Sequence, residues 1–186
     1  WFGKRNSDTC SLGDWVENRD KLPSGLAGFA KKINDLGLEF GLWFEPEMVS
    51  EDSDLYRAHP DWAIQISGRS HTYSREQLVL DLSKEEVCDY LIEAVSAVLQ
   101  SAPISYVKWD MNRNITNIPE HQANHEKHEF YHRYMLGLYR VLEELNRRFP
   151  DILFESCSGG GGRNDLGMLY YMPQAWASDN TDAIGR

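Results

Sequence analysis

The octapeptide at residues 106–113, Tyr-Val-Lys-Trp-Asp-Met-Asn-Arg, is a short apolar run that ends in charged and polar groups. Tyr106, Lys108 and Asp110 share one parity, so in a strand their side chains point to one face. Two opposite charges are costly to bury unless they are paired. A strand that carries Lys108 and Asp110 to its carboxyl end is typical of the floor of an active site. A structural Lys–Asp pair is the other interpretation of this spacing.

Carboxylates follow other apolar runs as well. The candidates are Glu45, Glu47, Asp110, Asp179 and Asp182. Asp110 and Asp179 could face one pocket from two strands, as the nucleophile and the acid/base of a retaining glycosidase, whose carboxyl groups lie about 5–5.5 Å apart. A ring of carboxylates that binds a metal ion is the alternative. The cation of Lys108 disfavours a metal beside Asp110, but the residues alone do not separate the two interpretations.

The glycine run 159–162 would let a ligand approach the backbone closely or would cradle a phosphate at a helix N-terminus, although it does not match GxxxxGK[ST]. Cys157 precedes this run. Because no histidine lies near it in sequence, we expect Cys157 to line the pocket rather than to act as a nucleophile. Trp43 and Trp176 also follow strand-like runs. Each of them is either a core residue or part of a wall that stacks on sugar rings.

Four histidines form a row, His121, His125, His128 and His132, with spacings of 4, 3 and 4 residues. The local sequence is not HExxH, and the row flanks the apolar stripe of a predicted helix. We therefore expect a solvated or subunit-facing row rather than a metal site.

Helices and strands alternate along the chain. Apolar residues at helical spacing predict helices over 23–36, 83–99 and 124–149, and a short helix or turn over 163–170. Strands are predicted over 38–44, 78–82, 104–110, 152–157 and 175–178. Ser83 and Glu86 match a capping box at the start of the second helix. The irregular segment 48–77 is long for a loop, which indicates a functional loop or a small insertion.

Polar residues collect after each predicted strand, which indicates a parallel sheet with its site at the carboxyl ends of the strands. An open doubly wound sheet and a (β/α)8 barrel both fit this pattern. A complete barrel needs about 250 residues, so this chain would supply roughly half of one.

The chain has 186 residues, 41% of them hydrophobic and 26% charged, as in a globular domain. Its formal net charge of −10, with no basic cluster, argues against nucleic acid or an anionic membrane as a partner. No apolar run reaches the roughly 20 residues of a membrane span. Three cysteines without a CxxC pair fit a reducing compartment, so we expect a cytoplasmic protein. Neither end resembles a natural terminus, and we expect a fragment that is inactive and aggregation-prone when expressed alone.

Several motifs together resemble the microbial α-galactosidases of glycoside hydrolase family 36. The three strongest are Lys-Trp-Asp-Met-Asn-Arg at 108–113, Cys-Ser-Gly-Gly-Gly-Gly-Arg at 157–163 and Ser-Asp-Asn-Thr-Asp at 178–182. Residues 1–5, 41–48 and 77–83 also look like that family. The match runs through the whole chain in the right order, and the ordered set is more specific than any single motif.

The resemblance implies a partial (β/α)8 TIM barrel. Residues 1–186 would be the central part of the catalytic domain, from the end of strand two through strand six, without the N- and C-terminal β-domains of the family. It places run 78–82 between barrel strands three and four. It implies Asp110 as the nucleophile and Asp179 as the acid/base. The implied substrate contacts are Trp43, Arg75, Lys108, Asn112, Cys157, Gly159 and Trp176. The resemblance implies no metal and no organic cofactor.

The expected function is hydrolysis of terminal α-galactosyl residues in oligosaccharides such as melibiose and raffinose, through a covalent galactosyl-enzyme. The full-length parent is expected to be a homo-oligomer. An α-N-acetylgalactosaminidase and an α-galactosyl transferase of the same fold remain alternatives. A metal-dependent barrel enzyme that uses Glu45, Glu47 and Asp110 and a non-catalytic sugar-binding remnant also remain open.

Overall fold

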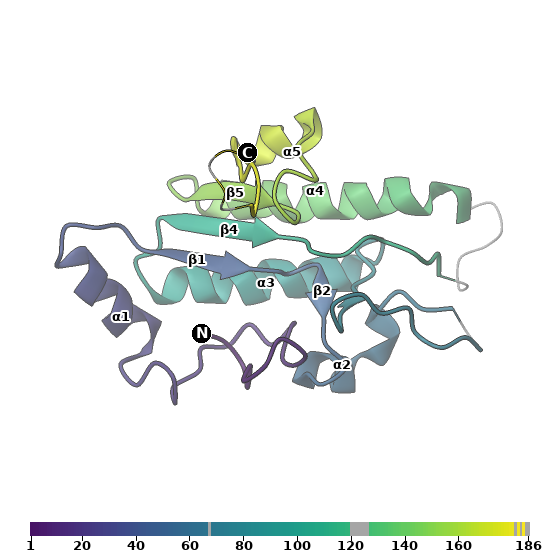
Figure 1. Cartoon of the computed structure of the whole chain (residues 1–186), viewed down its shortest axis with the longest axis horizontal. Helices are drawn as coiled ribbons and strands as arrows, with labels where there is room; N and C mark the ends of the chain where they lie inside the picture. The colour runs from purple at the N-terminus through teal and green to yellow at the C-terminus, as the bar shows by residue number, and fades with distance from the viewer. Residues whose placement is uncertain (67, 120–126, 181, 183, 185–186) are drawn as a thin grey trace.

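A parallel four-stranded sheet is the centre of the computed structural model, which describes residues 1–66, 68–119, 127–180, 182 and 184. In spatial order the strands are β1 (Gly41–Phe44), β4 (Tyr106–Asp110), β5 (Leu153–Cys157) and β6 (Gln174–Ala175). Neighbouring strands are parallel, with Trp43 opposite Lys108 and Asp110 opposite Cys157. The carboxyl ends of the strands therefore meet at one edge, as β1 and β4 show in Figure 1.

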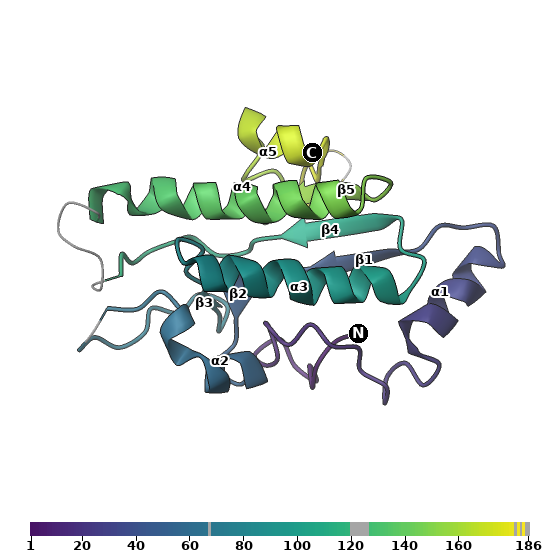
Figure 2. The same cartoon turned by 180° about the vertical axis from the view of Figure 1, so that it is seen from behind.

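Helices join the parallel strands. α3 (Glu85–Ser101) leads into β4, α4 (Phe130–Arg148) joins β4 to β5, and α5 (Leu166–Tyr171) joins β5 to β6. Figure 2 shows α3 and α4 side by side across one face of the sheet. Helical crossovers between parallel strands are the repeating unit of a (β/α)8 barrel. The predicted fold class is thus confirmed, and the strand order agrees with barrel strands three to six.

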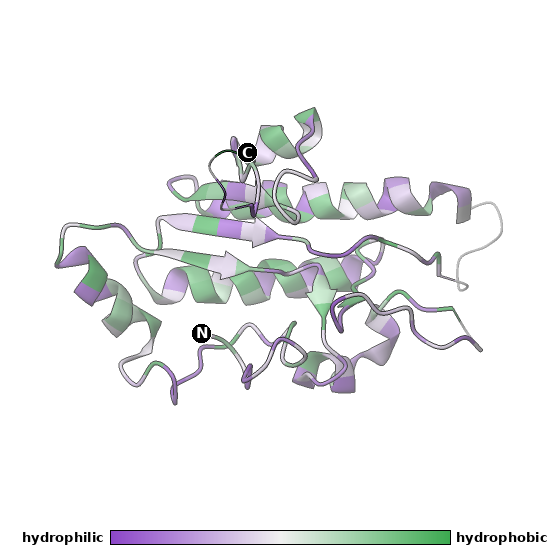
Figure 3. Cartoon of the chain, in the orientation of Figure 1, coloured by the Kyte–Doolittle hydropathy of each residue, from purple (hydrophilic) through white to green (hydrophobic). Residues whose placement is uncertain are grey.

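The core lies between this sheet and its helices. Val107 and Trp109 of β4 point toward the helices and are fully buried, so Lys108 and Asp110 point to the opposite face. The helices contribute an apolar stripe at helical spacing, which includes Val87, Leu91 and Val95 of α3 and Leu138, Leu142 and Leu145 of α4. Figure 3 shows this alternation of hydrophobic and hydrophilic residues along both helices. Each such buried side chain stabilises the fold by about 1.5–3 kcal/mol. None of the described helices is both long and apolar enough to span a membrane.

Run 78–82 lies outside the parallel sheet. β3 (Leu78–Val79) pairs antiparallel with β2 (Met48–Val49) in a separate two-stranded sheet. Between them lie α2 (Asp54–Ala58) and η1 (Pro60–Trp62). The position that the resemblance implies for this run, between barrel strands three and four, is confirmed. Segment 48–77 is thus a small folded insertion rather than a plain loop.

Some predicted boundaries are wrong by a few residues. α1 (Gly25–Asn34) begins after Pro23, because Gly25 has a φ of +67° and cannot extend the helix backward. β1 does not include Leu38, whose side chain is 60% exposed. The last predicted strand, 175–178, is shorter in the structure, where β6 pairs with β5 and ends at Ala175. Trp176 donates one further backbone hydrogen bond to β5. The predicted helix 124–149 corresponds to η2 (Lys127–Glu129) and α4, and residues 124–126 lie outside the described residues.

The predicted capping box at the start of α3 is wrong. Lys84 occupies the N-cap position, and its side chain makes no capping bond. The hydroxyl of Ser83 donates to Asp81 Oδ1 at 2.6 Å, and the Ser83 backbone N–H donates to the same oxygen at 3.0 Å. The Ser83 hydroxyl, which the sequence pattern predicts to cap the helix, is thus bonded to Asp81 instead.

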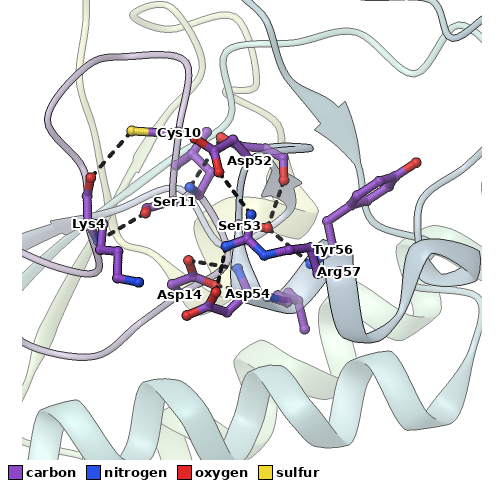
Figure 4. A network of polar contacts seen from close by, with 12 residues as sticks. Lys4, Cys10, Ser11, Asp14, Asp52, Ser53, Asp54, Tyr56 and Arg57 are labelled. Atoms are coloured by element: carbon purple, nitrogen blue, oxygen red, sulfur yellow. Dashed lines mark hydrogen bonds and ion pairs between the residues drawn. The ribbon is translucent and has the colours of Figure 1, made fainter.

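A polar network fastens the N-terminal loop 1–22 to α2 (Figure 4). Asp14 accepts hydrogen bonds from the backbone N–H groups of Asp54, at 3.0 Å, and Leu55, at 2.9 Å. Ser53 is the N-cap residue of α2 and accepts a further backbone N–H of the first turn. These bonds satisfy amides that have no partner within the helix. The loop is thereby held beside the insertion that follows β1.

Candidate active site

Asp110 ends β4, and its carboxylate is held by three donors. The side chain is 7% exposed. Oδ2 accepts a hydrogen bond from Trp43 Nε1 at 3.0 Å, and Oδ1 accepts one from the backbone N–H of Met111 at 3.0 Å. The thiol of Cys157, which lies opposite on β5, is the third donor. The carboxylate is thus fixed in one orientation, as a nucleophile requires.

The surroundings of Cys157 favour its protonated thiol over the thiolate. Burial raises the pKa of its thiol to about 11, and the hydrogen bond to Asp110 acts in the same direction. The backbone of Gly160 and the charge of Lys108 oppose this shift without cancelling it. Because the thiolate is the reactive form, this environment favours the predicted role of Cys157 in lining the pocket.

Lys108 connects β4 to the segment after β6. Its Nζ lies 4.5 Å from the ring centroid of Trp176, a cation–π contact, and Trp176 Nε1 donates to Asp179 Oδ1 at 2.9 Å. Among the described residues, no ion pair within 4.0 Å joins Lys108 to Asp110. The structural Lys–Asp pair is therefore not formed. Asp182, the other predicted carboxylate of this segment, accepts a bond from a nearby backbone N–H.

Both strand-end tryptophans direct their indole N–H groups to a candidate catalytic carboxylate. Trp43 is half-buried, with its ring stacked 6.3 Å from that of Phe2, and its backbone carbonyl accepts a hydrogen bond from Trp1 at 2.9 Å. Trp176 is half-buried as well. Neither residue is fully enclosed in the core, so both remain candidates for the predicted sugar-stacking wall.

Asn112 follows β4 and is held by Glu45. Glu45 Oε1 accepts the Asn112 backbone N–H at 3.0 Å and its side-chain amide at 2.9 Å. Gln77 donates to Glu45 Oε2 at 3.1 Å. Asn112 Oδ1 in turn accepts the backbone N–H of Gly159 at 3.2 Å. Gly159 has a φ of +54°, a conformation that favours glycine. This chain of bonds joins the loops that follow β1, β4 and β5.

Arg75 lies exposed in the turn at residues 74–77. Its charge acts on both Glu45 and Arg5. Arg5 is half-buried, and burial lowers the pKa of its guanidinium; Arg75 acts in the same direction, and Glu45 opposes it. We did not single out Arg5 from the sequence. The signal that could have found it is its place in the family-like motif at residues 1–5.

Glu47 is fully buried, and its carboxylate accepts four hydrogen bonds. Arg163 donates to Oε2 at 3.0 Å and to Oε1 at 2.8 Å. Trp109 Nε1 donates to Oε1 at 2.9 Å and the Tyr134 hydroxyl to Oε2 at 2.8 Å. Burial and the charge of Glu47 raise the pKa of Tyr134 well above its usual value. Both oxygens of Glu47, like those of Glu45, are thus engaged by protein donors, which disfavours the metal-binding alternative.

The predicted histidine row can be followed only in part. His121 and His125 lie outside the described residues. His128 lies on η2 and His132 on α4, and both side chains are exposed. For these two residues the exposure fits the predicted solvated or subunit-facing row.

Burial raises the pKa of Glu45, and the charge of Asp110 acts in the same direction, against the hydrogen bonds from Asn112. The folded state therefore binds this proton more tightly than the unfolded chain does, so stability falls as pH rises through the raised pKa. Each unit of such a shift corresponds to about 1.4 kcal/mol. We expect Glu45→Gln, whose amide oxygen still accepts bonds from Asn112, to raise the Tm of the full-length protein at about pH 8 and to change it little at about pH 4.

Calorimetry across this pH range measures the effect. Asp151→Asn is the control, since Asp151 is exposed and its replacement should give no Tm difference that grows with pH. A Tm difference for Glu45→Gln that stays constant with pH would contradict the prediction.

Known proteins match this chain along its whole length. A model of the Melibiase family matches residues 1–186. Alpha-galactosidase AgaA of Geobacillus stearothermophilus is 64% identical over 187 residues, which cover 100% of this chain and 26% of the relative. Alpha-galactosidase Mel36A of Lactobacillus acidophilus is 52% identical over 187 residues, with coverages of 100% and 26%. The chain thus spans about a quarter of the length of the curated relatives that it matches.

Solved structures share the fold. The crystal structure of the GH36 α-galactosidase AgaA matches with a TM-score of 0.97 and 62% identity, over 100% of this chain and 26% of that one. Variants of AgaA in complex with stachyose and with raffinose match with TM-scores of 0.96. The galactosidase domain of AgaSK matches with a TM-score of 0.92 and 52% identity, over 99% of this chain and 25% of that one. The parallel sheet and its helices are therefore an arrangement that these enzymes contain.

Proposed function

Because this chain belongs to the Melibiase family, we propose that the full-length protein that contains it is a retaining α-galactosidase. The observation that carries the proposal is the placement of two carboxylates, Asp110 after β4 and Asp179 after β6, each bonded by a tryptophan indole. A retaining glycosidase uses one carboxyl group as its nucleophile and a second as acid and then base. The two residues supply one group of each kind from different strands.

In the first step Asp110 attacks the anomeric carbon of galactose, and the bond from this carbon to the leaving oxygen breaks. Asp179 donates its proton to that oxygen, and a covalent galactosyl-enzyme forms. Trp43 and the Met111 N–H hold the attacking carboxylate in place before the substrate arrives. Lys108, on the same face of β4, steadies the negative charge and binds a ring hydroxyl.

In the second step Asp179, now ionised, takes a proton from a water molecule. The water oxygen attacks the anomeric carbon, the bond to Asp110 breaks, and galactose leaves with its original configuration. Two inversions at one carbon give retention. The enzyme ends in its starting protonation state.

The remaining predicted residues bind the sugar. Asn112 and Arg75 donate hydrogen bonds to hydroxyl groups, Trp43 and Trp176 form the apolar wall, and Cys157 and Gly159 line the floor. AgaA variants have been crystallised with stachyose and raffinose. We therefore propose the terminal α-galactosyl residues of such oligosaccharides as substrates.

Replacing Asp179 tests the acid/base role. We expect Asp179→Ala to lower kcat/KM for raffinose by about 10²-fold. The loss for p-nitrophenyl α-galactoside should be smaller, because nitrophenolate leaves without needing a proton. Asp182→Ala is the matched control, since Asp182 accepts a local backbone bond, and it should stay near wild-type rates. Equal losses on both substrates would contradict the role of Asp179.

Further assays identify the stereochemistry of the reaction and the preferred sugar. ¹H NMR of the first-formed product should show α-galactose, and β-galactose would exclude the double displacement. Faster turnover of the α-N-acetylgalactosaminide would support that alternative, and transfer to an acceptor sugar in excess of hydrolysis would support a transferase. Binding of galactose without any turnover would indicate a non-catalytic protein.

A cytoplasmic location, a homo-oligomeric parent and the domain assignment stay predictions.

A further inference from the structure

A buried arginine joins the loop after β4 to the turn that carries Arg75. Arg113 is 7% exposed. Its Nη1 donates to the backbone carbonyl of Gln77 at 2.7 Å, and its Nη2 donates to the backbone carbonyl of Thr72. Nη2 also donates to the Thr116 hydroxyl, within its own loop, at 3.2 Å. The guanidinium therefore bridges a carbonyl before the turn at residues 74–77 and the carbonyl of the last residue of that turn.

The turn between those carbonyls has an unfavourable backbone. Gln77 donates its N–H to the carbonyl of Ser74 at 3.2 Å, which closes the turn. The two central residues, Arg75 and Glu76, have φ values of +56° and +54°. Two successive positive φ values are typical of a type I′ turn, which strongly prefers Asn-Gly. Two long side chains at these positions are strained, so the surroundings must hold the conformation.

The bonds of Arg113 are placed to do this. They fix the backbone at Thr72, before the turn, and at Gln77, its last residue. The side chain of Gln77 is tied in turn to Glu45, which also holds Asn112. The base of the turn is thus fixed to the same framework as the loop after β4.

Burying the guanidinium of Arg113 costs more free energy than a purely structural role would require. Burial lowers the pKa of its guanidinium, and its hydrogen bonds go to two carbonyls and a hydroxyl rather than to carboxylates. Its Nε is buried with no hydrogen-bond partner among the described residues. A buried cation without a counter-charge is costly, and a neutral side chain could fill the same space.

We infer that Arg113 is a positioning residue, which clamps the strained turn at residues 74–77 so that Arg75 presents its guanidinium to the sugar. The inference rests on the proposed function, in which Arg75 contacts the substrate. Arg113 itself touches no substrate. It acts through the backbone on both sides of Arg75.

A double-mutant cycle on the full-length protein tests the inference. Arg75→Ala, Arg113→Met and the double variant are compared with wild type for kcat and KM on p-nitrophenyl α-galactoside. We expect each single variant to lower kcat/KM by about tenfold, mainly through KM, and the double variant to be no more than about twofold worse than Arg75→Ala alone. Losses that multiply would overturn the inference, because Arg113 would then act independently of Arg75.

The cycle distinguishes failure of the inference about Arg113 from failure of the substrate contact of Arg75. A wild-type rate for Arg75→Ala would remove Arg75 from the substrate site and would overturn the inference together with that contact. A normal defect in Arg75→Ala combined with multiplying losses would overturn the inference alone. Arg148→Met is the control, since Arg148 pairs with Glu93 and Glu144, away from the turn, and should leave kcat and KM unchanged.

A second pair of variants covers the case in which Arg113→Met does not fold. Arg113→Lys keeps the charge but loses the fork that spans two carbonyls. Glu76→Gly relieves the positive φ at residue 76. We expect the double variant Arg113→Lys/Glu76→Gly to have a kcat/KM at least about threefold higher than that of Arg113→Lys alone, because the turn then needs less support. No recovery would show that Arg113 does not hold the turn against strain.

Discussion

The full-length protein carrying Asp110→Ala is expected to fold normally and to turn over α-galactosides on the order of 10⁴- to 10⁶-fold more slowly than wild type. The reason is chemical. Without this carboxylate no group is positioned to attack the anomeric carbon, and the covalent galactosyl-enzyme cannot form. The loss should appear in kcat, measured with p-nitrophenyl α-galactoside, since the sugar contacts remain.

Azide makes this prediction specific. Removal of the side chain leaves space beside the Trp43 indole, which donates to Asp110 in the intact site at 3.0 Å. A small anion can enter that space and attack from the face that the carboxylate occupied. The expected product is the galactosyl azide of inverted, β configuration, identified by NMR. Asp110→Asn is the matched control, because it is equally inactive but fills the space. Failure of azide to accelerate Asp110→Ala, or a product of α configuration, would contradict the nucleophile assignment.

The second large effect is on stability. Glu47→Gln is expected to lower the free energy of unfolding of the full-length protein by about 3–5 kcal/mol, because it leaves the largely buried Arg163 without its counter-charge. The amide can still accept bonds at one oxygen. Its NH₂ group, however, faces donors from Arg163 and the Tyr134 hydroxyl, which contacted the second carboxylate oxygen. Urea unfolding at neutral pH gives the difference.

Two comparisons isolate the buried pair. Glu129→Gln removes a carboxylate that pairs with Arg133 on the surface at 3.1 Å, and it should cost less than about 0.5 kcal/mol. The double variant Glu47→Met/Arg163→Met should recover the part of the loss that comes from the lone Arg163 charge, but not the part that comes from the buried Trp109 and Tyr134 donors, which lose their acceptor. A Glu47→Gln protein as stable as Glu129→Gln would contradict the role given to this network.

Much of the framework could be predicted from local patterns. Parity along 106–110 placed Lys108 and Asp110 on one face, and the apolar stripes of α3 and α4 showed how helices cover the other. These features depend on neighbouring residues in sequence. The resemblance then supplied the barrel order and moved run 78–82 out of the sheet, which periodicity alone could not do, because a two-residue antiparallel pair has the same apolar signature as a barrel strand.

The contacts that hold the site together could not be predicted in this way. Glu47 looked like a candidate catalytic or metal-binding carboxylate until its four donors were known. Arg113 looked like the end of a motif, and the two backbone carbonyls that it binds lie 36 and 41 residues away in sequence. Such bonds depend on how distant loops meet, and no local pattern records that. The capping box failed for a related reason, since Asp81 takes the serine that the pattern assigned to the helix.

The bond between Glu47 and Arg163 spans 116 residues of sequence. During synthesis the chain emerges from its N-terminus, so Glu47 and Trp109 leave the ribosome well before Arg163 does. Burying the carboxylate earlier would leave a charge without its cation inside the core. The carboxylate beneath the floor of the site therefore acquires its counter-charge only once residue 163 has been made.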